Sequence, residues 1–155
     1  MKSKTQKNRI LISKEVYSKE ITKKFLKDIT EKILSELNLN NVEISITLTD
    51  NERIREINKE WRGKDKPTDV LSFPQNETIG YKYRLLGDVI ISLPYAKAQA
   101  EEIGLTLKEE VLRLMIHGIL HLLGYDHETN EEDAKIMFEL QDKIFDKLTC
   151  ELQHP

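Results

Sequence analysis

A change of hydrophobic period between residues 21 and 49 restricts the fold of this chain more than any other feature. In the first part, apolar residues recur every fourth position, as on one side of an amphipathic helix: Ile21, Phe25, Ile29, Ile33 and Leu37. In the second part, VEISITLT alternates apolar with polar residues, as in a strand with one buried face. Both apolar surfaces require cover, so the chain is expected to pack helices against a sheet.

Shorter patterns add the remaining elements of this expected fold. Strands are expected in three further segments: RILI (9–12), DVLSF (69–73) and GDVIIS (87–92). Helices are expected over 94–103 and after three Thr-x-x-Glu capping boxes, which begin at Thr49, Thr106 and Thr129. Since no repeat or linker interrupts the pattern, we predict one compact domain over residues 1–155. Its class is α/β (α+β), with a small mixed sheet of about four strands packed with about five helices.

The charge balance and the cysteine content limit the functions that this chain can have. The 155 residues include 24 Lys and Arg against 27 Asp and Glu, so any RNA-binding site must be a local basic patch. Cys150 is the only cysteine and cannot form an intramolecular disulfide, and no apolar run approaches the length of a membrane span. We therefore expect a cytoplasmic protein that does not associate with a membrane.

Two basic stretches could each be either solvated or involved in binding RNA phosphates. Residues 1–8 are expected to form a mobile tail, although a phosphate-binding arm is an alternative. This N-terminal stretch and the first residue after it carry four cations: Lys2, Lys4, Lys7 and Arg9. Lys82 and Arg84 lie in a polar stretch between two expected strands, where they are either solvated or directed at RNA.

Three of the four histidines fall within the eleven residues HGILHLLGYDH, positions 117 to 127. His117 and His121 are four residues apart, so on a helix they share one face and can direct two ring nitrogens at one point. Gly124 is expected to end this helix in a left-handed conformation, after which the chain can bring His127 to the same point. Three neutral imidazoles suit zinc and leave a fourth position for water, so we predict one zinc ion per chain.

The spacing of the three histidines and of Gly124 is that of the extended zinc motif of metzincin proteases. Those enzymes carry a general-base glutamate directly after the first histidine, where this chain has Gly118. A peptidase of that type is therefore disfavoured. We expect that a glutamate placed at position 118 would direct negative charge toward the position of an RNA phosphate.

A second dense stretch, NKEWRGKDKPTDVLSFP, occupies positions 58 to 74. The planar guanidinium of Arg62 can grip a phosphate. Three neighbouring lysines can attract an RNA backbone: Lys59, Lys64 and Lys66. Trp61 can stack on a base, but its helical spacing from two isoleucines favours a role as a core anchor. Asp69 and Ser72, on the following expected strand, are candidates for the lining of the same cleft.

Taken together, WRGKDKPTDVLSFP, LGDVIIS and HGILHLLGYDH resemble, in this order, three motifs of the YbeY family of bacterial rRNA-maturation endoribonucleases. The resemblance spans most of the chain from Val42 to the last expected helix. It implies a compact α/β fold and a zinc ion held by the three histidines of the last motif. It also implies cleavage of single-stranded RNA, 16S rRNA 3′ end maturation and ribosome quality control at the small subunit, with Arg62 as the functional arginine.

We therefore predict a zinc-dependent, single-strand-specific endoribonuclease, a metal-binding hydrolase that acts in rRNA processing and ribosome biogenesis. Its predicted catalytic residues are Arg62, His117, His121 and His127. The metal would activate a water or a ribose hydroxyl, and Arg62 would stabilise charge on the phosphate. Asp126 would either orient a ligand imidazole or cap the turn after the helix.

Two alternatives remain at this point. The first is a zinc-dependent hydrolase of another substrate, such as a metzincin-like peptidase. The second is a non-catalytic ribosome-assembly factor with structural zinc. A fourth protein ligand would favour the assembly factor, and an open coordination position would favour an enzyme.

Overall fold

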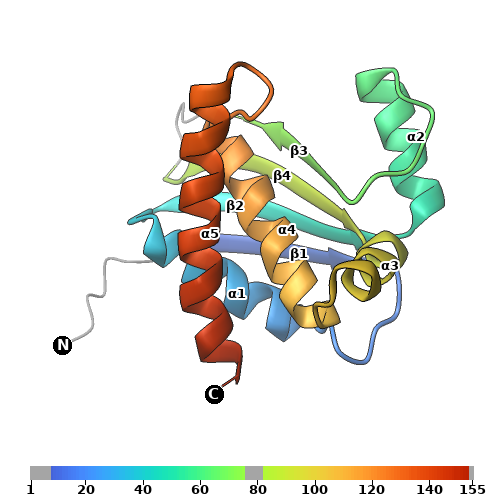
Figure 1. The fold of residues 1–155 in the computed structure, drawn as a ribbon, viewed down its shortest axis with the longest axis horizontal. Coiled ribbons are helices and arrows are strands. Elements are labelled where there is room, and N and C mark those ends of the chain that lie inside the picture. Colours follow the sequence, from blue (N-terminus) through green and yellow to red (C-terminus); the bar gives the residue numbers. More distant parts are fainter. Residues whose placement is uncertain (1–7, 76–81, 154–155) are drawn as a thin grey trace.

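In the computed structural model of the protein, residues 8–75 and 82–153 are described. These residues form four strands and five helices (Figure 1). In chain order they are β1 (Arg9–Lys14), α1 (Lys23–Glu36), β2 (Val42–Thr49), α2 (Asn51–Arg62), β3 (Val70–Pro74), β4 (Arg84–Ser92), α3 (Leu93–Ile103), α4 (Leu107–Leu122) and α5 (Glu131–Gln153). The predicted fold class, a single α/β (α+β) domain with a small mixed sheet, is confirmed.

The sheet is mixed and has the strand order β1-β2-β4-β3. Strands β1, β2 and β4 are parallel, and β3 runs antiparallel to β4, with Ser72 opposite Val89. The alternation predicted for β2 is confirmed, because every second residue from Val42 to Leu48 is buried and the residues between them are partly exposed. The buried face of β2 is covered by helices, as a strand with one apolar face requires.

Helices α1 and α4 pack on one face of the sheet, and α5 lies against both of them on the outer side (Figure 1). Most of α4 is buried, because β3 and β4 lie on one side of it and α3 and α5 on others. A helix that is apolar nearly all round has to be enclosed in this way. Among residues 8–75 and 82–153, no helix has both the length and the apolarity needed to cross a membrane.

The helix starts differ from the predicted capping boxes at two of three places. The box that begins at Thr106 is present at the start of α4. At α2 the cap is Asp50, whose side chain accepts from the third helical N–H, while Thr49 still belongs to β2. At α5 the side chain of Asn130 accepts in the same way, so the predicted cap at Thr129 is also wrong. Asp and Asn cap a helix at least as well as Thr, which explains both shifts of one residue.

The N-terminal stretch that we predicted to be a mobile tail, residues 1–8, lies outside the described residues except for Asn8. The Asn8 side chain donates to the Leu39 carbonyl at 3.1 Å and accepts from the Val42 N–H at 3.1 Å. Arg9, which we had grouped with the tail cations, is the first residue of β1. The described part of the chain therefore begins next to β1, the strand at one edge of the sheet.

The polar stretch between β3 and β4 is described only at its ends, since residues 76–81 lie outside the described part. Strand β4 begins at Arg84, three residues before the predicted start at Gly87. Lys82 is exposed, and its ammonium lies 5.8 Å from the ring centroid of Tyr83. Neither Lys82 nor Arg84 borders the cleft that contains the histidines.

Candidate metal centre and cleft

The end of α4 and the loop after it bring three imidazoles together. His117 and His121 lie one helical turn apart, and their ring centroids are 4.8 Å from each other. The ring of His127, which comes from the loop, lies 5.2 Å from each of them. One ring nitrogen of each residue can be chosen so that all three lie within 4.8 Å of one another. The structure thus brings together the three histidines that the sequence spacing directed at one point.

Gly124 allows the chain to reverse after α4. Its φ of +99° lies in the left-handed region that favours glycine. The Gly124 N–H donates to the His121 carbonyl at 3.0 Å, and the Tyr125 N–H donates to the Leu120 carbonyl at 3.1 Å. These two bonds form a Schellman motif, which satisfies carbonyls that a helix end leaves free. The reversed chain reaches the other two imidazoles with His127.

Asp126 caps the turn that carries His127. Its Oδ1 accepts from the Glu128 N–H at 2.8 Å. This bond and one with Thr129 hold the pKa of the Asp126 carboxyl below its ordinary value, and the nearby His121 and His127 act in the same direction. Within the described part of the chain, its carboxylate has no hydrogen bond to an imidazole. Of the two roles considered for Asp126, the structure therefore supports the cap.

The electrostatic state of the cluster suits a cation. Burial lowers the pKa of His117 and of His121 below the ordinary value, and repulsion between the neighbouring rings lowers it further. The two rings are therefore neutral at pH 7 and have lone pairs available for a metal. The Nδ1 atom of His127 is buried and has no hydrogen-bond partner among the described residues. A buried polar atom without a partner costs about 1–3 kcal/mol. Here a metal ion could be that partner, because the imidazole nitrogen can donate its lone pair to it.

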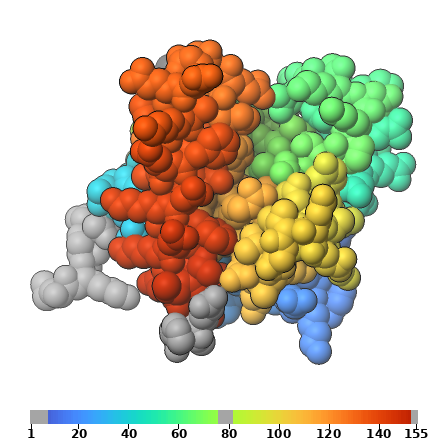
Figure 2. All heavy atoms as spheres, in the orientation of Figure 1, coloured from blue at the N-terminus to red at the C-terminus, as the bar shows by residue number. Residues whose placement is uncertain are grey.

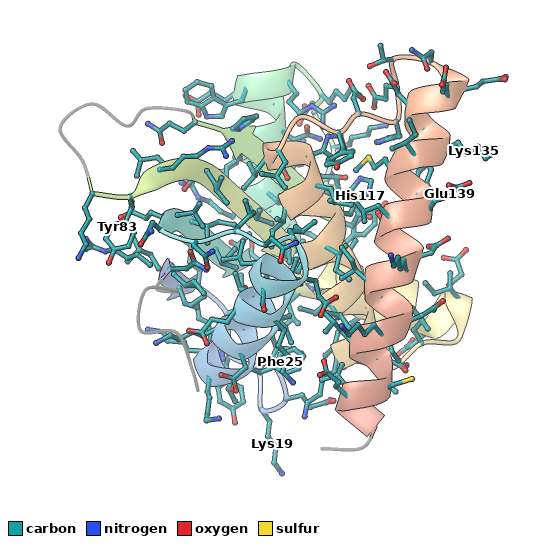
Figure 3. All side chains as sticks on the ribbon, turned by 90° about the vertical axis from the view of Figure 1, so that its left-hand side faces the viewer. Lys19, Phe25, Tyr83, His117, Lys135 and Glu139 are labelled. Atoms are coloured by element: carbon teal, nitrogen blue, oxygen red, sulfur yellow. The ribbon has the colours of Figure 1, made fainter. Side chains whose placement is uncertain are left out.

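His117 is oriented by a residue that the sequence analysis missed. Its Nδ1 lies 2.7 Å from Oε1 of Gln141 on α5, and Figure 3 shows His117 between α4 and α5. Because an amide oxygen only accepts, Nδ1 carries the proton and Nε2 keeps the lone pair for a metal. Gln141 is only 3% exposed. It lies at helical spacing from the buried Met137, Ile144 and Leu148, so a polar residue within this apolar stripe was the signal that identifies it.

We expect Gln141→Leu to weaken zinc binding by about 10- to 100-fold, as is typical when the hydrogen-bond partner of a ligand histidine is removed. Leucine has a similar volume, so α5 should still pack on α4. Competition with a zinc chelator at pH 7 measures the affinity. Gln141→Glu, which restores an acceptor for the His117 Nδ1 proton, should bind zinc at least as tightly as the wild type. Equal affinity of the leucine variant and the wild type would show that packing alone orients His117.

The three histidines line part of a cleft with a volume of about 770 Å³. Another part of its lining comes from the end of α2 and from the segment that leads into β3, and includes Trp61, Arg62, Lys64 and Lys66. Figure 2 shows the surface hollowed between the orange segment, which includes the end of α4 and the loop after it, and the green region of α2. The two dense stretches of the sequence therefore border the same cavity, although they lie far apart along the chain.

The basic part of this lining keeps its charges available. Arg62, Lys64 and Lys66 are exposed, and within the described residues none of them forms an ion pair. Lys59, which we had grouped with these cations, lies outside the cleft lining, and its ammonium is 3.9 Å from the Asp65 carboxylate. The cleft thus contains three cations that can neutralise phosphate groups.

Asp69 and Ser72 line the cleft, and both are held by bonds to the protein. The Asp69 carboxylate accepts from the Val70 N–H at 2.7 Å and from the Gln99 side chain at 3.2 Å. The Ser72 hydroxyl donates to the Gly118 carbonyl at 2.9 Å and so ties β3 to α4. These contacts indicate that both side chains stabilise the walls of the cleft.

Gly118 is a packing position, which corrects our expectation for a glutamate there. A Cβ atom at this residue would lie 2.8 Å from Cγ1 of Val89 and 3.1 Å from Oγ of Ser72. Both neighbours belong to the sheet, and the valine side chain is stiff. A side chain at 118 would therefore start toward the sheet and disturb the packing of α4 on β4, instead of directing charge at a phosphate. Close helix–sheet contact is the physical reason for glycine next to the first ligand.

The prediction that Trp61 is a core anchor is wrong. Its side chain is 68% exposed, whereas the buried residues of α2 are Ile54 and Asn58. The indole borders the cleft, and its ring centroid lies 6.3 Å from that of Phe73, with an interplanar angle of 63°. Helical spacing indicated which residues share a side of α2, but the core covers only part of that side.

Comparisons with known proteins agree with this geometry. The sequence model of the family described as Endoribonuclease YbeY matches residues 7–149. A protein named Endoribonuclease YbeY from a Sulfurihydrogenibium species is 95% identical over 98% of this chain and 100% of its own length. Another of that name, from Persephonella marina, is 67% identical over 91% of this chain and 93% of its own length. The solution structure of a Thermotoga maritima protein has a TM-score of 0.66 and 34% identity, and the match covers 93% of this chain and 91% of that one. The resemblance drawn from the three motifs is confirmed, and the chain belongs to the YbeY family of endoribonucleases.

Proposed function

We propose that this protein is a zinc-dependent endoribonuclease that cleaves single-stranded RNA. The observation that carries the proposal is the common cleft, in which three imidazoles and three cations without ion-pair partners in the described structure border one cavity. The imidazoles are suited to a metal and the cations to a phosphate backbone. The names of the relatives support RNA as the substrate.

Each residue has a defined task in this proposal. His117, His121 and His127 hold one zinc ion per chain. When bound, zinc supplies a Lewis acid that lowers the pKa of a water or of a ribose hydroxyl. Arg62 binds the scissile phosphate through its planar guanidinium and stabilises the charge that develops there. Lys64 attracts the adjoining backbone, together with Lys66.

The size of the cleft supports a preference for unpaired RNA. A cavity of about 770 Å³ is comparable to the sites of small molecules and admits single nucleotides of an unpaired strand. In a duplex the bases are stacked inside the helix, so proteins reach them mainly in single strands, loops and ends. The chemistry proposed here thus fits a strand that threads the cleft.

The biological part of the proposal follows from the family. It comprises 16S rRNA 3′ end maturation and ribosome quality control, with the small ribosomal subunit as partner and a cytoplasmic location. The family relationship supports these tasks, whereas the cleft supports the chemistry.

Two alternatives have less support. A metzincin-like peptidase would need a general base beside the first ligand, and position 118 is a glycine that packs on the sheet. An assembly factor with structural zinc would close the metal site with a fourth protein ligand. Among the described residues, the cluster contains no fourth His, Cys, Asp or Glu.

The test combines three substrates with one metal treatment. Zinc-loaded protein is incubated with single-stranded RNA, with a duplex of the same sequence and with casein, before and after chelation. We expect cleavage of the single strand only, loss of cleavage on chelation and recovery when zinc is restored. Cleavage that resists complete removal of the metal would contradict the proposal. Hydrolysis of casein with intact RNA would favour the peptidase, and inertness toward all substrates at full zinc occupancy would favour the assembly factor.

A further inference from the structure

The cleft contains an aromatic pair for which metal binding and phosphate binding provide no role. We propose that Trp61 and Phe73 form a stacking site for one unpaired nucleobase of the RNA strand. The inference rests on the proposed function and deepens it, because it assigns a place in the cleft to a base.

The exposure of Trp61 is the first observation. Tryptophan is highly buried on average in folded proteins, yet this side chain is 68% exposed and borders the cavity. The partly buried Phe73 meets it edge to face at 6.3 Å. This contact supports the indole from one side and leaves much of its surface accessible. An exposed aromatic surface in a cavity is suited to another flat ring.

Side-chain bonds connect α2, which carries the indole, to the loop that follows it. Trp61 lies in the last turn of α2, and the buried Asn58 on the same helix donates from Nδ2 to the Lys66 carbonyl at 2.9 Å. Arg55, also on α2, binds the Asp65 carboxylate at 2.7 Å. The helix and the loop after it are therefore tied together at two points. A surface that is ordered before binding loses less entropy when a ligand binds.

The charges beside the indole indicate which flat ring binds. Arg62 follows Trp61 in the sequence, and Lys64 and Lys66 line the same cavity without ion-pair partners in the described structure. An aromatic surface next to several cations matches a nucleotide, whose base stacks while its phosphate is neutralised. An uncharged aromatic residue of a protein partner would leave these cations without counter-charges. The occupant is therefore a base of the strand whose phosphates the cations bind.

The single tryptophan of the chain makes the site directly observable. The full-length protein, freed of metal with a chelator so that RNA stays intact, is titrated with a labelled single-stranded oligoribonucleotide. Anisotropy of the label measures binding, and intrinsic fluorescence reports on Trp61. We expect saturable quenching of the indole in parallel with binding. An oligomer of the same length that lacks bases should bind through its phosphates with clearly weaker quenching.

Variants then separate stacking from support of the fold. Trp61→Ala should weaken binding of single-stranded RNA about tenfold, within the range measured for loss of one base–aromatic stack. Trp61→Phe keeps an aromatic surface and should retain most of the affinity. Tyr17→Ala is the matched control, because Tyr17 is 86% exposed and lies outside the cleft lining, and it should bind like the wild type. On the oligomer without bases, Trp61→Ala and the wild type should bind equally.

The outcomes distinguish this inference from the proposed function. Binding of RNA without quenching would overturn the stacking site, as would an equal loss of affinity on RNA and on the oligomer without bases. Quenching by RNA that the zinc-loaded protein then fails to cleave would preserve the stacking site and contradict the endoribonuclease. Cleavage of RNA by a protein whose indole fluorescence does not change on binding would support the endoribonuclease and contradict the stacking site.

Discussion

The His121→Ala variant is expected to lose its zinc ion and, with it, RNA cleavage. Two imidazoles would remain, and zinc sites of this kind are held by three or four ligands. Structural zinc sites, which have four ligands, have binding free energies of about 10–16 kcal/mol. Each ligand therefore contributes about 3 kcal/mol, so the loss of one should lower the zinc affinity more than 100-fold. Metal analysis after gel filtration should therefore find little zinc in the variant, and cleavage of single-stranded RNA should fall to background.

The fold should survive this substitution. The His121 side chain is only partly buried, and the residues of α4 that form the core are its apolar neighbours. Circular dichroism should therefore match the wild type. Glu139→Ala on α5 is a suitable control, because Glu139 is exposed and, among the described residues, its one ion-pair partner is the exposed Lys135 on the same helix. This variant should keep both zinc and activity. Full zinc occupancy in His121→Ala would exclude the three-histidine site.

The Arg62→Lys variant is expected to keep its zinc and its fold but to cleave RNA about 100-fold more slowly, the order of magnitude for loss of one group that stabilises a developing charge. Lysine preserves the charge but replaces a planar fork of donors with a compact ammonium, so the two-point contact with a phosphate is lost. The loss should lie mainly in kcat, because Arg62 is proposed to bind most strongly to the transition state. Zinc content and thermal unfolding should not change.

Arg53→Lys is the matched control for this experiment. Arg53 is also an exposed arginine of α2, but it lies outside the cleft and its guanidinium is 3.6 Å from the Glu56 carboxylate. The same exchange at this position should leave kcat and KM as in the wild type. If Arg62→Lys were as active as Arg53→Lys, the guanidinium of Arg62 would have no special role, and charge alone would suffice at this position.

Much of the fold could be predicted from local periodicity, because this pattern depends on the geometry of a single helix or strand. Alternation in β2 and the four-residue spacing in α1 report how side chains alternate or stack along one element, which depends on backbone geometry alone. The same holds for His117, His121 and Gly124, since a helix and its glycine cap set their relative positions. The caps of α2 and α5 lie one residue later than predicted, because two neighbouring residues can each cap a helix.

Contacts between distant segments were beyond this kind of reasoning. Gln141, which the sequence analysis missed, orients His117 from α5. Its polarity within an apolar stripe could have marked its position but not its partner on α4. The burial of α2 was misjudged for a related reason. Periodicity shows which residues share a side, but the area of the partner surface decides how many of them are covered, and Trp61 remains outside it.

The sequence by itself determined the ligand chemistry of this protein: three imidazoles at helical and turn spacing, a glycine that reverses the chain, and a basic segment with one arginine and one tryptophan. Only the tertiary structure decided that these segments border one cleft, because the packing of β3 on β4 and on α4 brings the end of α2 close to the loop that carries His127. That packing also turned position 118 toward the sheet and left Trp61 at the cavity. Such long-range contacts depend on the shapes of many buried side chains at once, which no local pattern records.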